Sequence, residues 1–253
     1  MRISVAVAQV PVIWSVESNL ATILAAIRDV DEGTLLVLPE AALSGYDDEL
    51  SGLGDLDPDE IDRGRDVIAN TAAELGVHVL CGSLVFDQEH WWNAAMYFSP
   101  SGSSWLYKKV NLAMHERGAL AAGSALRTLH LSLPTGPVIA GVQLCREIRF
   151  PEQWRSLAFQ GASVLIYMTY AVNPAQVAGV WRAHLISRAA ETQRFVLAAN
   201  VADSDQHCPT MIISPRGDVI AEASDSTPTI LRRWIDLTDV RDDYLHQQRE
   251  DLG

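Results

Sequence analysis

The sequence has few cysteines and no long apolar run, and each scarcity excludes a class of protein. Cys81, Cys145 and Cys208 are too few and odd in number for a disulfide framework, which predicts a reducing, cytoplasmic location. No apolar stretch approaches the ~20 residues that a membrane-spanning helix needs. We therefore expect neither a disulfide-stapled secreted domain nor a membrane partner.

Positive charge is also scarce. Lysine and arginine number 19 against 32 aspartate and glutamate, and the formal net charge is −13. A surface this acidic repels phosphate backbones, so we expect no nucleic-acid partner. The acidic cluster between residues 47 and 62 is typical of a solvated loop leading into a helix, not of a metal site.

Cofactor signatures are missing as well. There is no glycine-rich phosphate loop, so a nucleotide cofactor is not expected. His207 and Cys208 stand alone, whereas zinc takes about four ligands. We expect no metal and no cofactor.

What the chain does contain is an alternation of short apolar strands and amphipathic helices across 253 residues, 48% of them hydrophobic. No glycine-, serine- or proline-rich linker divides it, so residues 1–253 are expected to form one mixed α/β domain with helices covering the sheet faces. The predicted helices are 19–28, 61–75 (closed by Gly76), 151–160 and 181–193. The predicted strands are 3–8, 35–38, 77–80, 94–98, 105–107, 138–144, 164–167, 195–199, 211–213, 219–221 and 231–235.

Cys145 is the first candidate for chemistry. It follows an apolar strand, residues 137–144, and precedes a helix that can begin at Pro151. A nucleophile between a strand and a helix is exposed above the sheet, with backbone N–H groups directed at it. The alternative is an ordinary buried core cysteine, which the local pattern alone does not exclude.

Glu40 and Lys109 are weaker candidates when each is taken alone. Glu40 ends an apolar strand, where a carboxylate is costly unless it is paired, but it could also cap the next element. Lys109 stands beside Lys108 in apolar surroundings that could bury one of the two, but a solvated basic pair explains the same pattern.

Together, three segments resemble the motifs of the carbon–nitrogen hydrolase (nitrilase-like) superfamily, in its amidase-type branch. They are Leu38-Pro39-Glu40, Tyr107-Lys108-Lys109-Val110-Asn111-Leu112 and Cys145-Arg146-Glu147-Ile148-Arg149-Phe150-Pro151-Glu152. Their order and separations both fit, and Glu116 falls seven residues after Lys109, where the family has a second glutamate. Weaker matches extend the resemblance over essentially the whole chain.

The resemblance implies a four-layer α-β-β-α sandwich (the nitrilase-like fold) and an amidohydrolase. Cys145 would attack the carbonyl carbon of a small-molecule amide, Glu40 would be the base, and water would hydrolyse the thioester. Lys109 and the backbone N–H of Arg146 would form the oxyanion hole, with Glu116 holding Lys109 in register. Family members usually pair across a helical face, which implies a homodimer or a higher homo-oligomer.

Substrate-binding residues are predicted near this centre. The resemblance gives Arg149 a position that meets a substrate carboxylate in enzymes hydrolysing N-carbamoyl amino acids. The interpretation we favour is instead a buried structural arginine paired with Glu147 or Glu152. Tyr46 and the segments 115–125 and 169–174, which include Thr169 and Tyr170, are expected to shape the pocket.

Other functions remain open at this level. The first alternative is an N-carbamoyl hydrolase, which would release carbon dioxide together with ammonia. A second is acyl transfer to an acceptor other than water, and a third is a catalytically silent binding protein. His184, Arg188 and Glu191 share one helix face, and we interpret them as a buried Arg–Glu pair tying that helix to the sheet.

Overall fold

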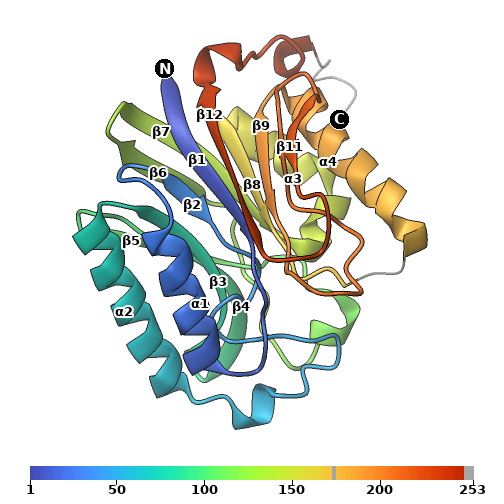
Figure 1. Ribbon diagram of the computed structural model, residues 1–253. Coiled ribbons are helices and arrows are strands. Elements are labelled where there is room, and N and C mark those ends of the chain that lie inside the picture. Colours follow the sequence, from blue (N-terminus) through green and yellow to red (C-terminus); the bar gives the residue numbers. More distant parts are fainter. Residues whose placement is uncertain (173–174, 248–253) are drawn as a thin grey trace.

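The chain forms two six-stranded sheets, seen together in Figure 1. The computed structural model describes residues 1–172 and 175–247. In spatial order, the first sheet contains β12 (Thr229–Asp236), β1 (Arg2–Gln9), β2 (Leu35–Val37), β3 (His78–Asp87), β4 (His90–Phe98) and β5 (Ser104–Lys108). The second contains β11 (Val219–Glu222), β10 (Met211–Ile213), β9 (Phe195–Ala199), β8 (Val164–Met168), β7 (Gly136–Leu144) and β6 (Thr128–Leu133).

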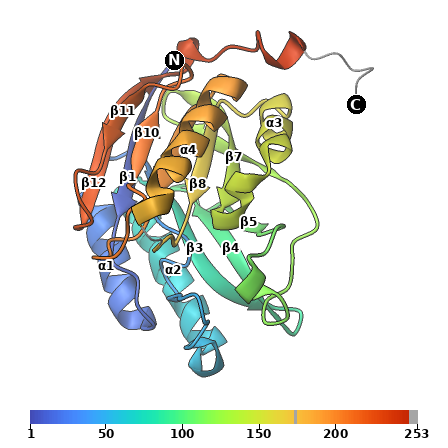
Figure 2. The same ribbon diagram turned by 90° about the vertical axis from the view of Figure 1, so that its right-hand side faces the viewer.

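The two sheets pack face to face and each is covered by two helices. One face of the first sheet meets the second sheet through side chains such as Val5 and Val7 against Val142 and Ile166. Its other face packs on α1 (Val16–Arg28) and α2 (Pro58–Leu75). The outer face of the second sheet packs on α3 (Pro151–Phe159) and α4 (Ala178–Thr192), which Figure 2 shows from the front. The predicted α-β-β-α sandwich is confirmed.

Local sequence explains where the helices begin and end. Asp57 caps α2 by accepting from the backbone N–H of Asp59, and Pro58 occupies the first turn, where its missing N–H costs nothing. Gly76 ends the helix in the left-handed conformation at φ 68°, as predicted. Helices α1 and α4 each begin three residues earlier than the apolar spacing predicted.

The strands differ from prediction in two places. β6 was not predicted, because its alternating residues 128–133 include His130 and two serine or threonine hydroxyls on the solvent side. β12 was predicted only as a last strand; it leaves the hairpin formed by β10 and β11 and pairs antiparallel with β1 in the other sheet. The chain therefore closes by joining its C-terminal part to its first strand (Figure 1).

Short 3₁₀ turns fill the connections that surround the site. They are η1 (Leu53–Asp55), η2 (Met114–Glu116), η3 (Cys145–Arg149), η4 (Ala175–Val177), η5 (Leu237–Asp239) and η6 (Leu245–Gln247). The last two residues of the predicted pocket segment 169–174 lie outside the described part of the chain. Of the helices described, none has both the length and the apolar character needed to cross a bilayer.

Candidate active site

The candidate site lies where parallel strands end. β1, β2 and β3 run parallel to one another at the centre of the first sheet, and β7, β8 and β9 do so in the second. Glu40 follows the end of β2, Cys145 follows β7 directly, and Thr169 follows β8 directly. The carboxyl ends of parallel strands are where open α/β sheets place their ligands. This geometry brings together residues that lie more than a hundred positions apart in the chain.

A buried cluster of charge joins three predicted residues. The Nζ atom of Lys109 lies 2.8 Å from Oε1 of Glu40 and 2.9 Å from Oε1 of Glu116, and all three side chains are fully buried. Asn93 completes the cluster, because its Nδ2 donates to Oε1 of both Glu40 (2.8 Å) and Glu116 (2.7 Å). Two carboxylates are thus held together around one ammonium and one amide.

Electrostatics keeps the cluster charged. Burial by itself lowers the pKa of Lys109, but the carboxylates of Glu40 and Glu116 outweigh it and raise that pKa above its usual value. Burial acts to raise the pKa of Glu116, yet the charge and hydrogen bonds of Lys109 and the amide of Asn93 lower it overall. Lys109 is therefore an ammonium, and Glu116 is a carboxylate.

Glu40 is fixed at both carboxylate oxygens. Oε1 is held by Lys109 and Asn93, and Oε2 accepts the backbone N–H of Tyr170 at 2.8 Å. Because Tyr170 lies just beyond β8, this bond ties the end of the first sheet to the end of the second. The carboxylate is oriented before any ligand is bound.

The turn that begins at Cys145 is strained and is held by several hydrogen bonds. Cys145 has φ 40°, in the left-handed region that non-glycine residues rarely occupy, and its carbonyl accepts from Tyr167 Oη at 2.8 Å. Glu147 is buried beneath the turn, and burial raises its pKa despite its hydrogen bonds. Its carboxyl group receives four donors: Leu144 N (2.7 Å), Tyr107 Oη (2.7 Å), Val110 N (2.8 Å) and Asn111 N (3.1 Å).

Glu147 therefore links the turn at Cys145 to the segment that follows Lys109. In the sequence it stood out only as a possible partner for Arg149 or as part of a motif. A second brace comes from α4, because Arg188 donates through Nε and Nη2 to the carbonyl of Ile148. Arg188 also pairs with Glu191 at 2.8 Å. The predicted pair therefore forms, but Glu191 is exposed, and Arg188 ties α4 to η3 and not to the sheet.

The thiol of Cys145 rests in its protonated form. Burial and the negative charge of Glu40 raise its pKa to about 12, although the ammonium of Lys109 opposes that rise. The thiolate is the nucleophilic form, so attack requires that the proton be removed as the reaction begins. The carboxyl group of Glu40 influences this thiol electrostatically.

A cavity of about 170 Å³ opens onto Cys145. Four of the predicted substrate-binding residues line it: Tyr46, Arg146, Arg149 and Tyr170. The other lining residues are Asp48, Ala113, His115, Cys145, Ile148, Val172, Val177 and Trp181. This wall combines apolar side chains with two arginines and the carboxylate of Asp48.

Thr169, the fifth predicted substrate-binding residue, is not among the lining residues. It is buried, and its hydroxyl acts to lower the pKa of the Cys145 thiol. The interpretation of Arg149 as a buried arginine paired with a glutamate is wrong. Arg149 is exposed, and its Nη1 lies 3.2 Å from Nε2 of His184, because η3 turns its side chain away from the core.

Two residues of the site were not anticipated from the sequence as individuals. Asn93 lies within an apolar strand, and a buried amide there was the signal that could have identified it. His115 fell inside the segment 115–125 that was expected to shape the pocket, but nothing in the sequence distinguished it. Both are recognised only from their hydrogen bonds.

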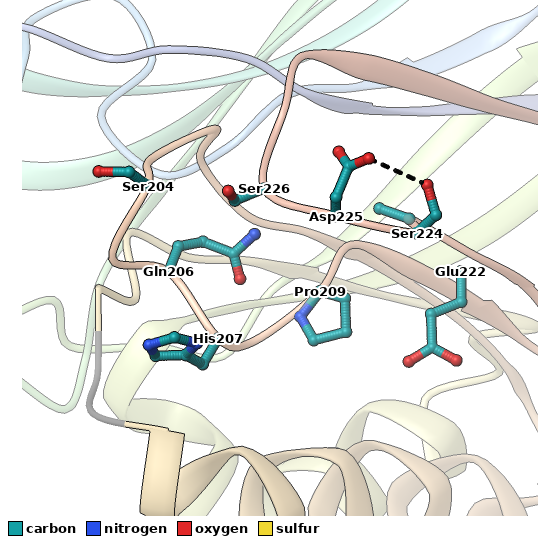
Figure 3. A pocket seen from close by; sticks show the side chains of 9 residues that line it. Ser204, Gln206, His207, Pro209, Glu222, Ser224, Asp225 and Ser226 are labelled. Carbon is teal, nitrogen blue, oxygen red and sulfur yellow. Dashed lines mark hydrogen bonds between the residues drawn. The ribbon is translucent and has the colours of Figure 1, made fainter.

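A larger hollow, of about 720 Å³, shares no lining residue with the cavity at Cys145. Figure 3 shows its polar side chains, which come from the loop between β9 and β10, from the end of β11 at Glu222, and from the segment that follows β11. It contains no cysteine, lysine or arginine. Among the described residues, no group of three or more histidine, cysteine, aspartate or glutamate side chains is arranged to hold a metal ion.

Known proteins share this fold and this sequence pattern. The structure of Nit3 from Saccharomyces cerevisiae, a member of the nitrilase superfamily, superposes with a TM-score of 0.80 at 22% identity, covering 99% of this chain and 96% of that one. An amidase variant from Nesterenkonia sp. AN1 gives a TM-score of 0.83 at 21% identity, covering 99% and 95%. These likenesses place the chain among α-β-β-α sandwiches of the nitrilase type.

The sequence matches define the family more narrowly. The family model described as carbon-nitrogen hydrolase matches residues 4–244, and the chain therefore belongs to the carbon-nitrogen hydrolase family. A 2-oxoglutaramate amidase of Bacillus subtilis (strain 168) is 32% identical over 218 residues, covering 83% of this chain and 81% of the relative. Another, of Paenarthrobacter nicotinovorans, is 25% identical over 257 residues, covering 93% and 85%.

Proposed function

We propose that the protein hydrolyses the C–N bond of a small linear amide through a thioester at Cys145, releasing ammonia and a carboxylic acid. The observation that carries this proposal is the buried cluster of Glu40, Lys109 and Glu116 beside a strained, cavity-lining cysteine. Family membership and the amidase names of its relatives support it. In the Nesterenkonia variant, the active-site cysteine carries the acetamide moiety of fluoroacetamide, which supports a cysteine nucleophile here.

In the first half of the reaction, Glu40 accepts the Sγ proton as sulfur attacks the amide carbon. The carbonyl π electrons move to oxygen and give a tetrahedral oxyanion. When that intermediate collapses, the C–N bond breaks and the proton on Glu40 passes to the leaving nitrogen. Ammonia departs, and the acyl group remains on Cys145 as a thioester.

In the second half, Glu40 accepts a proton from water while the water oxygen attacks the thioester carbon. The C–S bond then breaks, the proton returns to sulfur, and the carboxylic acid leaves. A base that works in both halves must stay oriented without substrate, and Glu40 does so through the donors on both of its oxygens.

Lys109 is suited to stabilise the oxyanion. Its ammonium has three N–H donors, of which two go to Glu40 and Glu116, so one remains for the substrate oxygen. The second donor is the backbone N–H of Arg146, because the first N–H groups of a helical turn have no partner within that turn. Loss of one such donor typically slows acyl transfer by about two to three orders of magnitude.

For the substrate class, we propose an amide that also carries a carboxylate. Arg146 and Arg149 are exposed residues that line the cavity, and a guanidinium can bind a carboxylate in a bidentate way. Two relatives are named 2-oxoglutaramate amidase, which is consistent with such a substrate. The second candidate is an N-carbamoyl amino acid, which would place its carboxylate on the same arginines.

The test is ammonia release from a panel of simple amides, carboxylate-bearing amides, N-carbamoyl amino acids and nitriles. We expect turnover of carboxylate-bearing amides without carbon dioxide, and none by Cys145→Ala. Arg149→Met should raise KM for those substrates and leave neutral amides unaffected. Carbon dioxide released along with ammonia would favour the N-carbamoyl alternative. No turnover by the wild type, with Cys145 inert to iodoacetamide, would overturn the proposal in favour of a binding protein.

A further inference from the structure

Tyr46 connects the cavity to the buried charge cluster. Its ring is buried and packs edge-on against His115, with centroids 5.8 Å apart, and lies 5.4 Å from the ring of Tyr170. Its hydroxyl lies 2.9 Å from Oε1 of Glu116 and 2.6 Å from Nε2 of His115. Both Tyr46 and His115 line the cavity with Cys145. A continuous chain of hydrogen bonds therefore runs from the cavity wall to Glu116.

The direction of each bond in this chain follows from counting protons. Glu116 is a carboxylate and can only accept, so the single hydroxyl proton of Tyr46 goes to Glu116. Burial, with the charges of Glu40 and Glu116, raises the pKa of Tyr46 well above its ordinary value, so the phenol keeps that proton. The remaining bond requires His115 to donate from Nε2 to the Tyr46 oxygen. Neutral imidazole protonated at Nε2 and imidazolium both satisfy this requirement.

We propose that His115 is a positioning residue for the reaction: by donating from Nε2 to Tyr46, it holds Tyr46 as a donor to Glu116. The inference rests on the proposed function, because Glu116 acts through Lys109 on the oxyanion. Hydrogen bonds in series polarise one another, so a donor to the Tyr46 oxygen strengthens the bond that Tyr46 makes. His115 reaches the cluster through Tyr46, and among the described residues no hydrogen bond joins its imidazole directly to Glu116 or Lys109.

The arrangement around Glu116 shows why this bond matters. Oε1 already accepts from Lys109 and Asn93, while Oε2 is held by the backbone N–H of Ala113 at 2.5 Å. Tyr46 is the third donor to Oε1. Without the hydrogen bond from Tyr46, the Glu116 carboxylate can rotate toward its remaining donors. Lys109 then moves with the carboxylate, and its free N–H no longer points at the substrate oxygen. The effect belongs to the transition state, so it is expected in kcat more than in KM.

The experiment compares two substitutions at one exposed position. Gln places an amide Nε2–H near the position of the imidazole Nε2, whereas Phe keeps the ring and removes the donor. We expect His115→Phe to lower kcat about tenfold with KM changed less than about twofold, and His115→Gln to restore kcat to within about threefold of the wild type. Thermal unfolding of both variants should match the wild type.

A double-mutant cycle tests whether His115 acts on Glu116 through the hydroxyl of Tyr46. If His115 acts through the hydroxyl of Tyr46, then Tyr46→Phe should lower kcat, and adding His115→Phe to it should have almost no further effect. The alkylation rate of Cys145 by iodoacetamide, an amide whose carbonyl can occupy the same site, is measured in parallel. It should show the same order: wild type, then Gln, then Phe.

These readouts separate the inference from the proposed function. Absence of amide turnover by the wild type would refute the proposed function, and the order of alkylation rates would still decide the role of His115. Equal rates for the wild type and His115→Phe would overturn the inference. Equal losses for Gln and Phe, or additive losses in the cycle, would also overturn it, because they indicate a steric role and not a donor.

Discussion

Replacement of Lys109 by methionine tests the charged cluster through stability alone. Methionine keeps the length and apolar stem of lysine but leaves Glu40 and Glu116 buried without their shared cation. Removing one partner of a buried ion pair typically costs about 3–5 kcal/mol, and here two carboxylates lose the same partner. Asn93 still donates to both and offsets part of that loss. We therefore expect Lys109→Met to lower the free energy of unfolding by about 3–5 kcal/mol at pH about 8.

The loss of unfolding free energy caused by Lys109→Met should be smaller at lower pH, and the direction of this change follows from the pKa shifts. In the wild type, Lys109 holds the pKa of Glu116 low, so the stability this gives is present above the unfolded pKa and is lost as the pH falls through the folded one. In the variant, burial and the neighbouring carboxylate raise that pKa. In the variant, the stability contributed by protonated Glu116 is therefore fully present below the pKa of that group in the unfolded chain, and it is lost as the pH rises through its pKa in the folded protein. Both trends narrow the difference between the two proteins as the pH falls.

Lys108→Met is the matched control. Lys108 pairs with Asp87 at 2.7 Å and lies 3.8 Å above the ring of Trp92, but its side chain is 21% exposed and that of Asp87 is 50% exposed. Such an exposed pair is screened by solvent and contributes little to stability. The assay is urea unfolding of the three proteins at pH about 8 and about 5.5. Equal costs for the two lysines, or a cost for Lys109→Met that does not change with pH, would refute this account of the cluster.

Three further predictions test the turn and the base. Glu147→Gln should lower the free energy of unfolding by roughly 2 kcal/mol or more, because the new amide nitrogen would face a backbone N–H that in the wild type donates to the carboxyl group. The measurement is urea unfolding, and an unchanged midpoint would contradict this prediction. Gly82→Ala should lower kcat without replacing any site residue, because the added Cβ would lie 2.6 Å from Cα of Glu40 and displace it. Gly54→Ala is the control, because a Cβ there meets no atom within 4 Å. Equal kcat values for the two variants would show that the contact with Glu40 is harmless. In Glu40→Gln, the alkylation rate of Cys145 should rise about tenfold per pH unit from pH about 7 to 9, because burial holds the thiol pKa high; a plateau near neutrality would argue for a resting thiolate.

Much of the architecture could be predicted from local patterns. The order of strands and helices, the end of α2 at Gly76 and the position of Cys145 between β7 and the turn that leads into α3 all follow from apolar periodicity and turn chemistry. These features depend on residues near one another in the chain. The strand β12 was also predicted, but the sheet that it joins was not, because pairing with β1 involves residues more than two hundred positions away.

The candidate site could likewise be predicted only in part from the sequence. The residue types and spacing indicated Glu40, Lys109 and Cys145, and resemblance to a family was needed to connect them. The sequence could not decide which of two adjacent lysines is buried. In the structure, β5 ends at Lys108, and Lys109 enters the core. There it is surrounded by Asn93 of the neighbouring strand β4, by Glu40 from the segment after β2, and by Glu116 of η2.

What the sequence by itself determined is the set of elements and the chemical groups that they carry. What only the tertiary structure decided is which of those groups meet. Asn93 lies between two glutamates, Glu147 lies beneath the turn at Cys145, and His115 contacts Glu116 through Tyr46. The reason is physical. A strand or helix is specified by neighbours along the chain. A hydrogen-bonded buried cluster is specified by the packing of two sheets, because its donors and acceptors come from distant parts of the chain.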